Sequence, residues 1–564
     1  MNNILKSMFN TEQELDSAIA DLTLGASKWA AMGIKERITL LQRTHRTVAE
    51  AAEDWALAAI EAKGINDEQM DGEEWMAGPY ATLNGLAAVI ESLTKIANGM
   101  SPALGLKTRQ VCGNRTAFTM LPGNLYEANL FHGFKGEIWL KPGISAEEAR
   151  KLAGLGAKRL GENGGVGLVL GAGNVSSIGP LDVLYELIAY NRVSVLKLNP
   201  TFAGLTAAYE SAFSPLIKAG FLRIVNGGAD VGQYLTGHSG INHIHITGSS
   251  VTHDMIVWGS VTDKSGEPKL NKSITSELGG VSPIIVVPGD WDEDDLRYQA
   301  EHVATQRFHN CGHNCIGGQA LIISADWKHK EAFLTEIRRV INELPSKASW
   351  YPGTERKIQA AENAYPNAEH INGRILLKVD SSTSQEALTT EYFGPVLAHI
   401  ELTGEGIEFL KTAVEFSNNE LDGTLGASII VAPEDRKIMG SAFELAIADL
   451  RYGTIGINVW SAIGFLIPAL SWGAYPGNTL DNVGSGIGFV HNSHLLKNIE
   501  RSVITGPFRP FPRSVAKGEI ALSPKPAWFV TAKTAKSVAQ HLTRFAADPS
   551  LGKLPGIFSQ AFRA

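Results

Sequence analysis

Two of the three cysteines of this 564-residue chain lie in one short run, FHNCGHNCIGG at residues 308–318, and Glu277 precedes that run by a few dozen residues. A cysteine is nucleophilic as its thiolate, which backbone N–H groups, a helix N-terminus or a nearby base stabilise. Gly312 lets the backbone approach a reacting centre closely, because glycine has no Cβ atom. A thiol and a carboxylate in this arrangement suggest covalent catalysis, with Cys315 as the candidate nucleophile.

Two other interpretations of the run stay open at this point. A cysteine often packs as a small hydrophobic residue that does no chemistry. Four side chains of the run also alternate as possible metal ligands: His309, Cys311, His313 and Cys315. Zinc sites, however, usually space their ligands as two separated pairs that wrap around a tetrahedron, so we predict no metal site here.

Four segments, in order along the chain, resemble motifs of the aldehyde dehydrogenase superfamily. They are GLVLGAGN at 167–174 with Lys197 after it, ITGSS at 246–250, ELGG at 277–280 with the cysteine run, and EYFGPV at 391–396 with the stretch 413–427 that follows. Each of these occurs by chance in unrelated chains, but their shared order is specific. The chain is therefore identified as similar to this family from about residue 30 to residue 490.

The resemblance implies roles for individual residues. Cys315 corresponds to the nucleophile, Glu277 to the base that activates water, and Asn174 to an oxyanion donor that acts with the Cys315 backbone N–H. The resemblance also implies NAD or NADP as the cofactor. The residues expected to bind it are Lys197, Asn199, Gly248, Ser249, Leu278, Glu391 and Phe393.

Three positions depart from the family pattern. His313 stands where the family commonly has a glutamine, and His253 lies near the place of a second glycine of the phosphate turn. Pro200, three residues after Lys197, replaces a glutamate that in many NAD-specific relatives accepts both ribose hydroxyls and would repel a 2′-phosphate. The choice between NAD and NADP therefore stays open.

The function implied by the resemblance is oxidation of an aldehyde to a carboxylic acid through a thiohemiacetal and a thioester on Cys315. One alternative is an acyl-CoA reductase of the same superfamily, in which coenzyme A takes the acyl group. The Asn199-Pro200 segment gives that alternative some support, whereas Glu277 opposes it because a thiol acceptor needs no strong base. A non-catalytic or metal-binding protein is the alternative from another class. Candidates for the substrate pocket wall, whose bulk favours an apolar or aromatic aldehyde, are Phe308, Trp460, Phe465 and Trp472.

Composition limits the possible partners. The formal net charge is −8 and no Lys/Arg cluster occurs, which argues against nucleic acid as a ligand. A small-molecule aldehyde is the expected partner, and we expect a homodimer or homotetramer. Three cysteines give no disulfide framework, so a cytoplasmic, reducing location is expected. Residues 455–476 carry no charge, but their Pro, Asn, Ser and Gly content favours a buried wall over a membrane span.

The hydrophobic pattern predicts an α/β fold. Residues 11–64 read as amphipathic helices, and short apolar strands alternate with helices from residue 165 to 247. Such alternation predicts a doubly wound parallel sheet that binds its ligand at the carboxyl ends of the strands. We expect this sheet to form the cofactor lobe, accompanied by an α/β catalytic lobe and a small bridging or oligomerisation element.

Three segments follow from this pattern as expected domains. Residues 1–275 would form the cofactor-binding domain, with strands inserted near 108–142. Residues 276–465 would form the catalytic domain. Residues 466–564 would return to the cofactor lobe, make an oligomer contact and end in an extension that is rich in Pro, Lys and Ala and that the family usually lacks.

Overall fold

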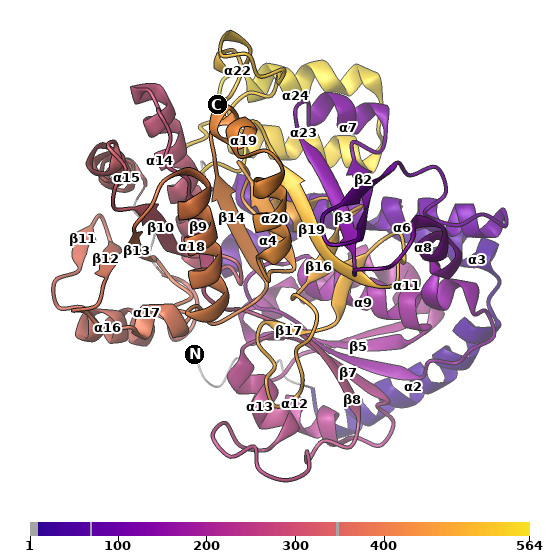
Figure 1. Ribbon diagram of the computed structural model, residues 1–564. Coiled ribbons are helices and arrows are strands. Elements are labelled where there is room, and N and C mark those ends of the chain that lie inside the picture. Colours follow the sequence, from indigo (N-terminus) through magenta and orange to yellow (C-terminus); the bar gives the residue numbers. More distant parts are fainter. Residues whose placement is uncertain (1–9, 68–69, 346–348) are drawn as a thin grey trace.

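The computed structural model describes residues 10–67, 70–345 and 349–564, and strand–helix alternation after residue 165 forms a six-stranded sheet in this part of the chain (Figure 1). In spatial order its strands are β17 (Gly486–Ile487), β8 (Ser273–Leu278), β7 (His243–Gly248), β4 (Val166–Leu170), β5 (Val193–Lys197) and β6 (Leu222–Val225). All neighbours are parallel except β17, which pairs with β8 in the antiparallel sense. The predicted α/β class is confirmed.

Helices cover this sheet because each has one apolar stripe. In α2 (Glu12–Ala31) the side chains of Leu15, Ile19, Leu22 and Trp29 are buried, at helical spacing. Thr11 and Glu14 close a capping box at its start. Further helices of this region are α3 (Ile34–Glu50), α4 (Ala52–Ala62), α5 (Gly72–Trp75), η1 (Met76–Tyr80), α6 (Ala81–Ala97), α9 (Ile178–Tyr190), η3 (Pro200–Leu205), α10 (Thr206–Ala212), α11 (Ser214–Ala219), α12 (Ala229–Gly237) and α13 (Ser250–Val257).

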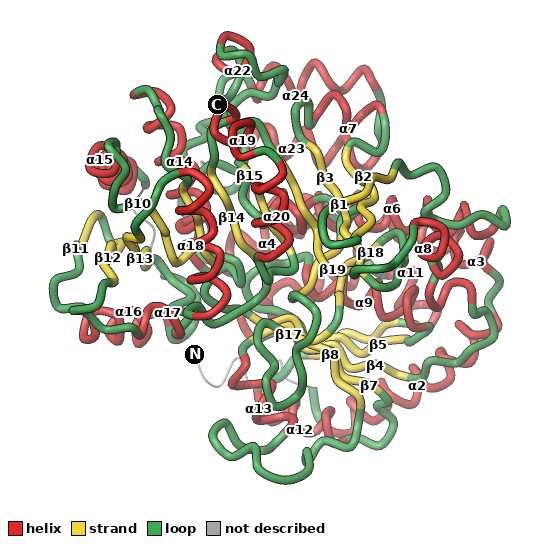
Figure 2. The backbone as a smooth tube through the Cα atoms, in the orientation of Figure 1, coloured by secondary structure: helices red, strands yellow, loops and turns green. Residues whose placement is uncertain are grey.

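A second sheet of eleven described strands runs through the rest of the molecule (Figure 2). Its order is β1 (Thr108–Val111), β2 (Arg115–Leu121), β3 (Lys135–Leu140), β19 (Ile499–Thr505), β15 (Thr454–Ile457), β14 (Gly426–Ile430), β9 (Ser282–Val286), β10 (Gly318–Ser324), β13 (Val396–Leu402), β12 (Arg374–Val379) and β11 (Glu369–Ile371). The centre from β19 to β12 is parallel, and both edges are antiparallel. The central strands β9, β10, β14 and β15 are buried along their whole length, as expected for strands covered on both faces.

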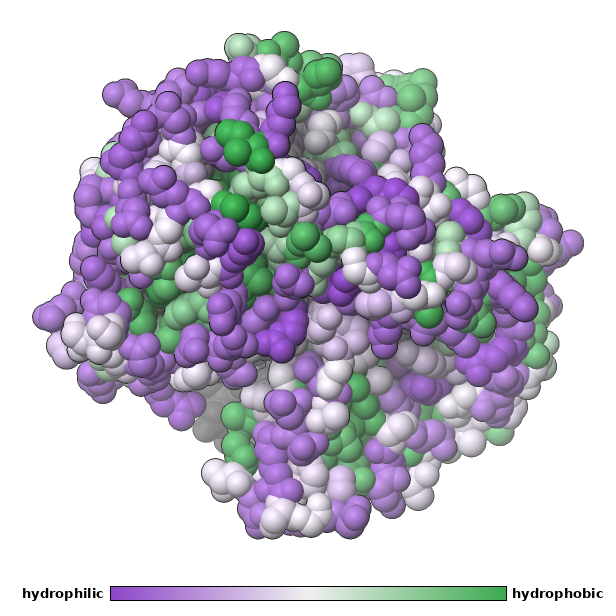
Figure 3. All heavy atoms as spheres, in the orientation of Figure 1, coloured by the Kyte–Doolittle hydropathy of each residue, from purple (hydrophilic) through white to green (hydrophobic). Residues whose placement is uncertain are grey.

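Helices also accompany the second sheet, and the molecular surface over this region is largely hydrophilic (Figure 3). They are α7 (Leu125–Leu130), α8 (Ala146–Leu152), η2 (Leu155–Lys158), α14 (Glu293–Phe308), η4 (His309–Gly312), α15 (Lys330–Glu343), α16 (Thr354–Ala364), α17 (Glu386–Thr389), α18 (Gly406–Asn419), α19 (Pro433–Met439), α20 (Ser441–Asp449) and α21 (Ile463–Leu466). Hydrophilic side chains dominate the face of the molecule seen in Figure 3, with apolar residues scattered among them.

Sheet membership refines the expected domain limits. The strands predicted near 108–142 join the second sheet through the β3–β19 pairing and do not pair with the cofactor-lobe strands. A boundary between residues 275 and 276 would cut β8, so we propose that it lies at Gly279-Gly280 instead. Residues 466–564 serve both sheets, because β17 pairs with β8 and β19 pairs with β15.

The uncharged stretch 455–476 is divided among short elements. β15 occupies its start, α21 its middle and the three-residue strand β16 (Ser471–Gly473) its end. In the described ranges, no helix combines the length and apolar character that crossing a membrane requires.

After β19 the chain forms what we call the C-terminal extension, residues 506–564. It contains α22 (Arg513–Ala516), α23 (Ala535–Ala547), η5 (Leu551–Lys553) and α24 (Leu554–Ala561), drawn in yellow in Figure 1. α23 packs against α5 and η1, and Phe545 stacks edge-on against Tyr126 of α7 with ring centroids 5.2 Å apart. The extension therefore bridges elements that belong to both sheets.

The extension is held along α14 by buried polar contacts. Arg509 donates two hydrogen bonds to Asp295, at 2.9 and 2.8 Å, and Gln299 Nε2 donates to the Phe508 carbonyl at 2.7 Å. Further along the helix, the Val530 N–H donates to Thr305 Oγ1 and the Thr531 hydroxyl donates to Glu301. α14 is the helix that leads into the cysteine run, so the extension steadies the approach to Cys315.

Replacing Arg509 with Ala should destabilise the protein by about 3 kcal/mol, because it leaves the buried Asp295 carboxylate with only the partly exposed Arg513. Urea denaturation and limited proteolysis of the extension would measure the loss. Arg339→Ala is the control, since it removes an exposed helix-surface pair with Glu343 and should cost less than about 1 kcal/mol. Equal losses in the two variants would contradict the anchoring role of Arg509.

Candidate functional site

The structure brings Cys315 and Glu277 together, although they belong to different sheets. Cys315 lies in the loop between η4 and β10, and Glu277 lies near the carboxyl end of β8. The Cys315 thiol donates a hydrogen bond to the Glu277 carboxylate. Trp472 of β16 donates its indole N–H to the same carboxylate, with 3.3 Å between Nε1 and Oε1.

Burial sets the protonation of this pair. Desolvation raises the pKa of Glu277 to about 7, the Cys315 hydrogen bond opposes that rise, and nearby Asp182 adds to it. Desolvation also raises the pKa of the Cys315 thiol well above its usual range, and the adjacent Glu277 raises it further. The thiol therefore holds the shared proton at neutral pH, and Glu277 lies close to the pH at which it gains or loses one.

The loop that carries Cys315 has a strained backbone. Asn310 and Cys311 have φ of 53° and 56°, a region that side-chain-bearing residues seldom occupy. Gly312 follows at 78°, and a Cβ atom there would lie 2.4 Å from the Gly394 carbonyl oxygen. The buried Arg307 clamps the loop by donating to the Gly317 and Gly394 carbonyls. These contacts tie the cysteine run to the EYFGP segment.

Asn174 lies directly after β4, beside the same loop. Its side-chain amide donates to the His313 carbonyl at 3.0 Å, and Asn310 Nδ2 donates to the Asn174 carbonyl at 3.0 Å. An amide carries two N–H donors, so one remains available for a ligand in the cavities that Asn174 lines together with Cys315. The side chain is thus oriented before any ligand binds.

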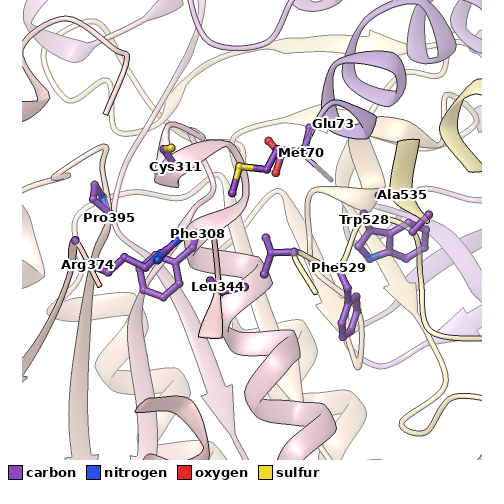
Figure 4. A pocket seen from close by; sticks show the side chains of 13 residues that line it. Met70, Glu73, Phe308, Cys311, Leu344, Arg374, Pro395, Trp528, Phe529 and Ala535 are labelled. Carbon is purple, nitrogen blue, oxygen red and sulfur yellow. The ribbon is translucent and has the colours of Figure 1, made fainter. Parts of the chain in front are cut away.

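The four possible metal ligands of the run do not converge. The Cys315 thiol bonds to Glu277, His313 Nε2 lies 3.0 Å from Thr354 Oγ1, and His309 packs its ring on Trp460. Cys311 lines a separate cavity with Phe308, Arg374 and Trp528 (Figure 4). Across the described ranges, no group of three or more His, Cys, Asp or Glu side chains could hold a metal ion.

Two cavities meet at Cys315. The first, here called the proximal cavity, has a volume of about 70 Å³ and is almost wholly apolar. Trp460, Phe465 and Trp472, proposed from the sequence as pocket walls, line it, whereas Phe308 lies in the Cys311 cavity. The second is a groove of about 1090 Å³ along the carboxyl ends of the parallel strands. Among the described residues, Asn174 and Cys315 alone line both the proximal cavity and the groove.

The groove collects most residues predicted to bind the cofactor. Its walls include Lys197, Asn199, Gly248, Ser249, Glu391 and Phe393, together with Pro200. Leu278 does not line it, because its side chain is buried at the end of β8 and its N–H donates to the Ser485 carbonyl. Sequence reasoning did not single out other walls of the groove, among them Gly232, Tyr351 and Lys357.

The donors and acceptors of the groove fit a phosphorylated dinucleotide. Ser249 caps α13, whose N-terminal N–H groups form an anion-binding position next to Gly248. Desolvation lowers the pKa of Lys197 to about 8 and raises the pKa of Glu391 to about 7. Within the described residues, Glu391 Oε1 has no hydrogen-bond partner although it is buried, so a ligand hydroxyl would satisfy it.

A polar column behind Glu277 was also missed from the sequence. Residues 243, 245 and 247 of β7 stand opposite residues 273, 275 and 277 of β8. Their side chains form a hydrogen-bonded ladder on one face, which includes His243, Thr275, His245 and Thr247. The available signal was the strict alternation of polar and apolar residues in HIHIT and the polar residues at every second position of SITSE, which are unusual for parallel strands covered on both faces.

Replacing Glu277 with Gln should shift alkylation of Cys315 to lower pH. The substitution removes the negative charge that raises the thiol pKa, so the thiolate forms more readily. Mass spectrometry of the Cys315 peptide after iodoacetamide treatment, at several pH values, measures this. Glu391→Gln is the control and should shift the profile less, since Glu391 makes no hydrogen bond to the thiol. Slower alkylation of the Glu277 variant at every pH would instead mean that Glu277 takes the thiol proton.

Comparison with known proteins agrees with this geometry. The model of the aldehyde dehydrogenase family matches residues 181–356. The N-succinylglutamate 5-semialdehyde dehydrogenase of Sphingopyxis alaskensis is 27% identical over 275 residues, which are 45% of this chain. That match spans about half, 54%, of the relative's length.

Solved structures share the fold over most of the chain. An NAD-dependent aldehyde dehydrogenase from Sinorhizobium meliloti superposes with a TM-score of 0.57 at 19% identity, covering 89% of this chain and 88% of that one. An NADP-dependent glyceraldehyde-3-phosphate dehydrogenase from Bacillus halodurans, complexed with NADP, gives 0.58 at 19% identity, covering 88% and 91%. The family match, the Sphingopyxis relative and the shared fold all support the resemblance of this chain to the aldehyde dehydrogenase superfamily.

Proposed function

We propose that this protein oxidises an aldehyde to a carboxylic acid with NAD or NADP, using Cys315 as the nucleophile. The observation that carries the proposal is the position of the thiol. Cys315 lies where a groove of dinucleotide size meets a small apolar cavity, and it bonds to a buried carboxylate. A thiol, a base and an amide donor around one point are what acyl chemistry on a carbonyl needs.

In the first step the Cys315 sulfur forms a bond to the aldehyde carbon and the thiol proton passes to water in the groove, which leaves Glu277 free for the later step. The carbonyl oxygen becomes an alkoxide, which the Asn174 amide and the Cys315 N–H are suited to hold. Preorganised donors of this kind contribute roughly 3 to 4 kcal/mol each when they face the developing charge. The Asn174 contacts with the cysteine loop keep the amide in place for that role.

A nicotinamide dinucleotide held in the groove would supply the hydride acceptor, and loss of hydride from the carbon bonded to Cys315 would leave an acyl group on the sulfur as a thioester. Glu277 then takes a proton from water while the water oxygen bonds to the acyl carbon. The C–S bond breaks, the sulfur regains a proton and the acid leaves. A base with a pKa near 7 is well matched to this task at neutral pH.

Lys197, Ser249 and Glu391 would hold the dinucleotide, with Lys197 and Glu391 toward its ribose hydroxyls and Ser249 with the α13 N-terminus toward its phosphates. Pro200 also lines the groove and carries no charge. The similar structures include an NAD-dependent and an NADP-dependent enzyme, which supports acceptance of either cofactor.

The proposal also covers the domain division, the cellular compartment and the assembly of the protein. The six-stranded sheet would serve as the cofactor domain and the parallel centre of the second sheet as the catalytic domain. The working thiol requires a reducing compartment such as the cytoplasm, and all three cysteines are free. A homodimer or homotetramer is the assembly we propose.

Replacing Cys315 with Ala should abolish aldehyde oxidation, because no covalent intermediate can form, while NADH and NADPH still bind. Cofactor fluorescence titration and a turnover assay without coenzyme A measure the two properties. Cys112→Ala is the matched control, since Cys112 lies at the edge of β1 far along the second sheet and should leave activity unchanged. Turnover in the Cys315 variant would refute the mechanism, and turnover of wild type only with coenzyme A would favour the acyl-CoA alternative.

Replacing Pro200 with Glu should weaken NADP binding by tenfold or more relative to NAD. A carboxylate near the 2′-phosphate costs about 1 to 4 kcal/mol at protein-surface dielectric, whereas ribose hydroxyls accept it as a partner. Titration of both cofactors against wild type and variant checks this, with Pro200→Gln as the uncharged control. If both cofactors lose affinity equally, residue 200 does not face the adenosine ribose.

A further inference from the structure

The proximal cavity continues into a second apolar cavity that the C-terminal extension builds. We propose that the two form one substrate site and that the preferred substrate is an aldehyde with a long, uncharged hydrocarbon chain. This inference rests on the proposed function and specifies its substrate class.

The continuity comes from shared walls. Four residues line both cavities: Met76, Ile463, Leu466 and Trp528. The second, here called the distal cavity, has a volume of about 80 Å³ and is as apolar as the proximal one. The extension supplies about half of its wall, including Val538, Leu542, Ile557, Phe558 and Ala561. A chain that starts at Cys315 therefore reaches the extension by passing Trp528.

Two polar side chains of the distal wall, Lys525 and Ser523, are already engaged. Lys525 pairs with Glu301 at 3.3 Å, and the Ser523 hydroxyl donates to the His132 carbonyl at 2.7 Å. A substrate carboxylate in this cavity would be desolvated without a partner, which is costly. The site is therefore unsuited to a charged semialdehyde of the kind named for the Sphingopyxis relative.

Trp528 controls the passage between the cavities. Its ring packs edge-on against Phe134, with centroids 6.1 Å apart. Its indole Nε1 is buried, and no hydrogen-bond partner for it exists in the described part of the chain. Because the ring is a shared wall, its size sets the width of the channel.

A series of linear aldehydes from butanal to dodecanal tests the channel. In wild type, kcat/KM should rise about two- to fourfold for each methylene that becomes buried, until both cavities are filled. Ala561→Trp fills the distal cavity and should abolish the gain for long chains while leaving butanal unchanged. Ser559→Trp, on the exposed part of the same helix, is the matched control. Trp528→Ala should extend the substrate range to branched chains.

If kcat/KM does not change with the length of the aldehyde, the proposed channel is wrong. The same conclusion follows if Ala561→Trp lowers the activity with all aldehydes equally. In either case oxidation of butanal would leave the proposed function standing. If no aldehyde of any length is oxidised, the proposed function itself fails.

A different observation, the hydrogen-bonded polar ladder on β7 and β8 behind Glu277, leads to a second inference. Each turnover releases two protons, because an aldehyde, water and an oxidised cofactor yield a carboxylate and a reduced cofactor. We infer that the ladder on β7 and β8 conducts protons from Glu277 to the surface.

The ladder runs from the surface inward through successive hydrogen bonds. Ser273, which is exposed, lies 2.7 Å from His243 Nδ1, and His243 Nε2 lies 3.0 Å from Thr275 Oγ1. The same hydroxyl lies 2.9 Å from His245 Nδ1, and His245 Nε2 lies 3.2 Å from Thr247 Oγ1. The inner end of the path is Thr247, the register partner of Glu277, whose hydroxyl donates to Asp182 at 3.0 Å, so a proton from Glu277 has to cross to this pair first.

The charged groups around the ladder favour transfer of a proton from Glu277 toward the surface. Asp182 and Glu186 of α9 face the two imidazoles, and His491 of β18 (Phe489–Asn492) faces Asp182. Glu277 faces His245, and Arg192 lies close to His243. The acidic groups stabilise a transient imidazolium at His245, while hydroxyls on both sides can donate and accept.

Thr275→Val breaks the ladder without changing its shape. In stopped-flow experiments with an indicator dye, proton release should slow about tenfold relative to formation of reduced cofactor, and Thr275→Ser should restore it. Thr454→Val is the matched control, because this buried threonine on β15 has a hydroxyl that makes no hydrogen bond within the described residues. Unchanged proton release in Thr275→Val would overturn the relay.

Discussion

The arrangement of the site depends on one proton that two buried groups, the Cys315 thiol and the Glu277 carboxylate, share. Glu277 and Cys315 cannot both be anions in a desolvated site, so the hydrogen bond between them fixes where the charge resides. Each group belongs to a different sheet, and the pair therefore forms only when the six-stranded and eleven-stranded sheets are correctly apposed. Two hydrogen bonds cross between the sheets at this point, from the Asn174 amide to the His313 carbonyl and from the Trp472 indole to Glu277.

Much of this arrangement was predictable because it depends on local patterns. The apolar runs 166–170, 193–198 and 243–246 are short and bounded by turns, and each proved to be a strand of the parallel sheet. Ligand sites lie at the carboxyl ends of such strands, which is why Asn174, Lys197 and Gly248 gather around one groove. The order of the four motifs identified Cys315 as the candidate thiol and Glu277 as the candidate carboxylate.

What could not be predicted depends on contacts between distant segments. The β3–β19 pairing joins residues near 138 and 502, and nothing in either segment names its partner. The expected boundary after residue 275 falls inside β8 for a similar reason, since sheet membership is decided by pairing. His243 and His245 carried a visible alternation, yet only the register with β8 shows that they continue toward Glu277. The extension packs through scattered apolar residues that no motif marks.

The bracing of α14 by the C-terminal extension has a consequence for how the site comes into being. The contacts to Asp295, Gln299, Glu301 and Thr305 come from residues 508–531, which the ribosome adds long after Cys315 has emerged. Until then the helix that sets the cysteine loop lacks buried partners for several polar groups. The thiol environment is thus completed late in synthesis, and a nascent chain exposes an ordinary cysteine instead of a tuned nucleophile.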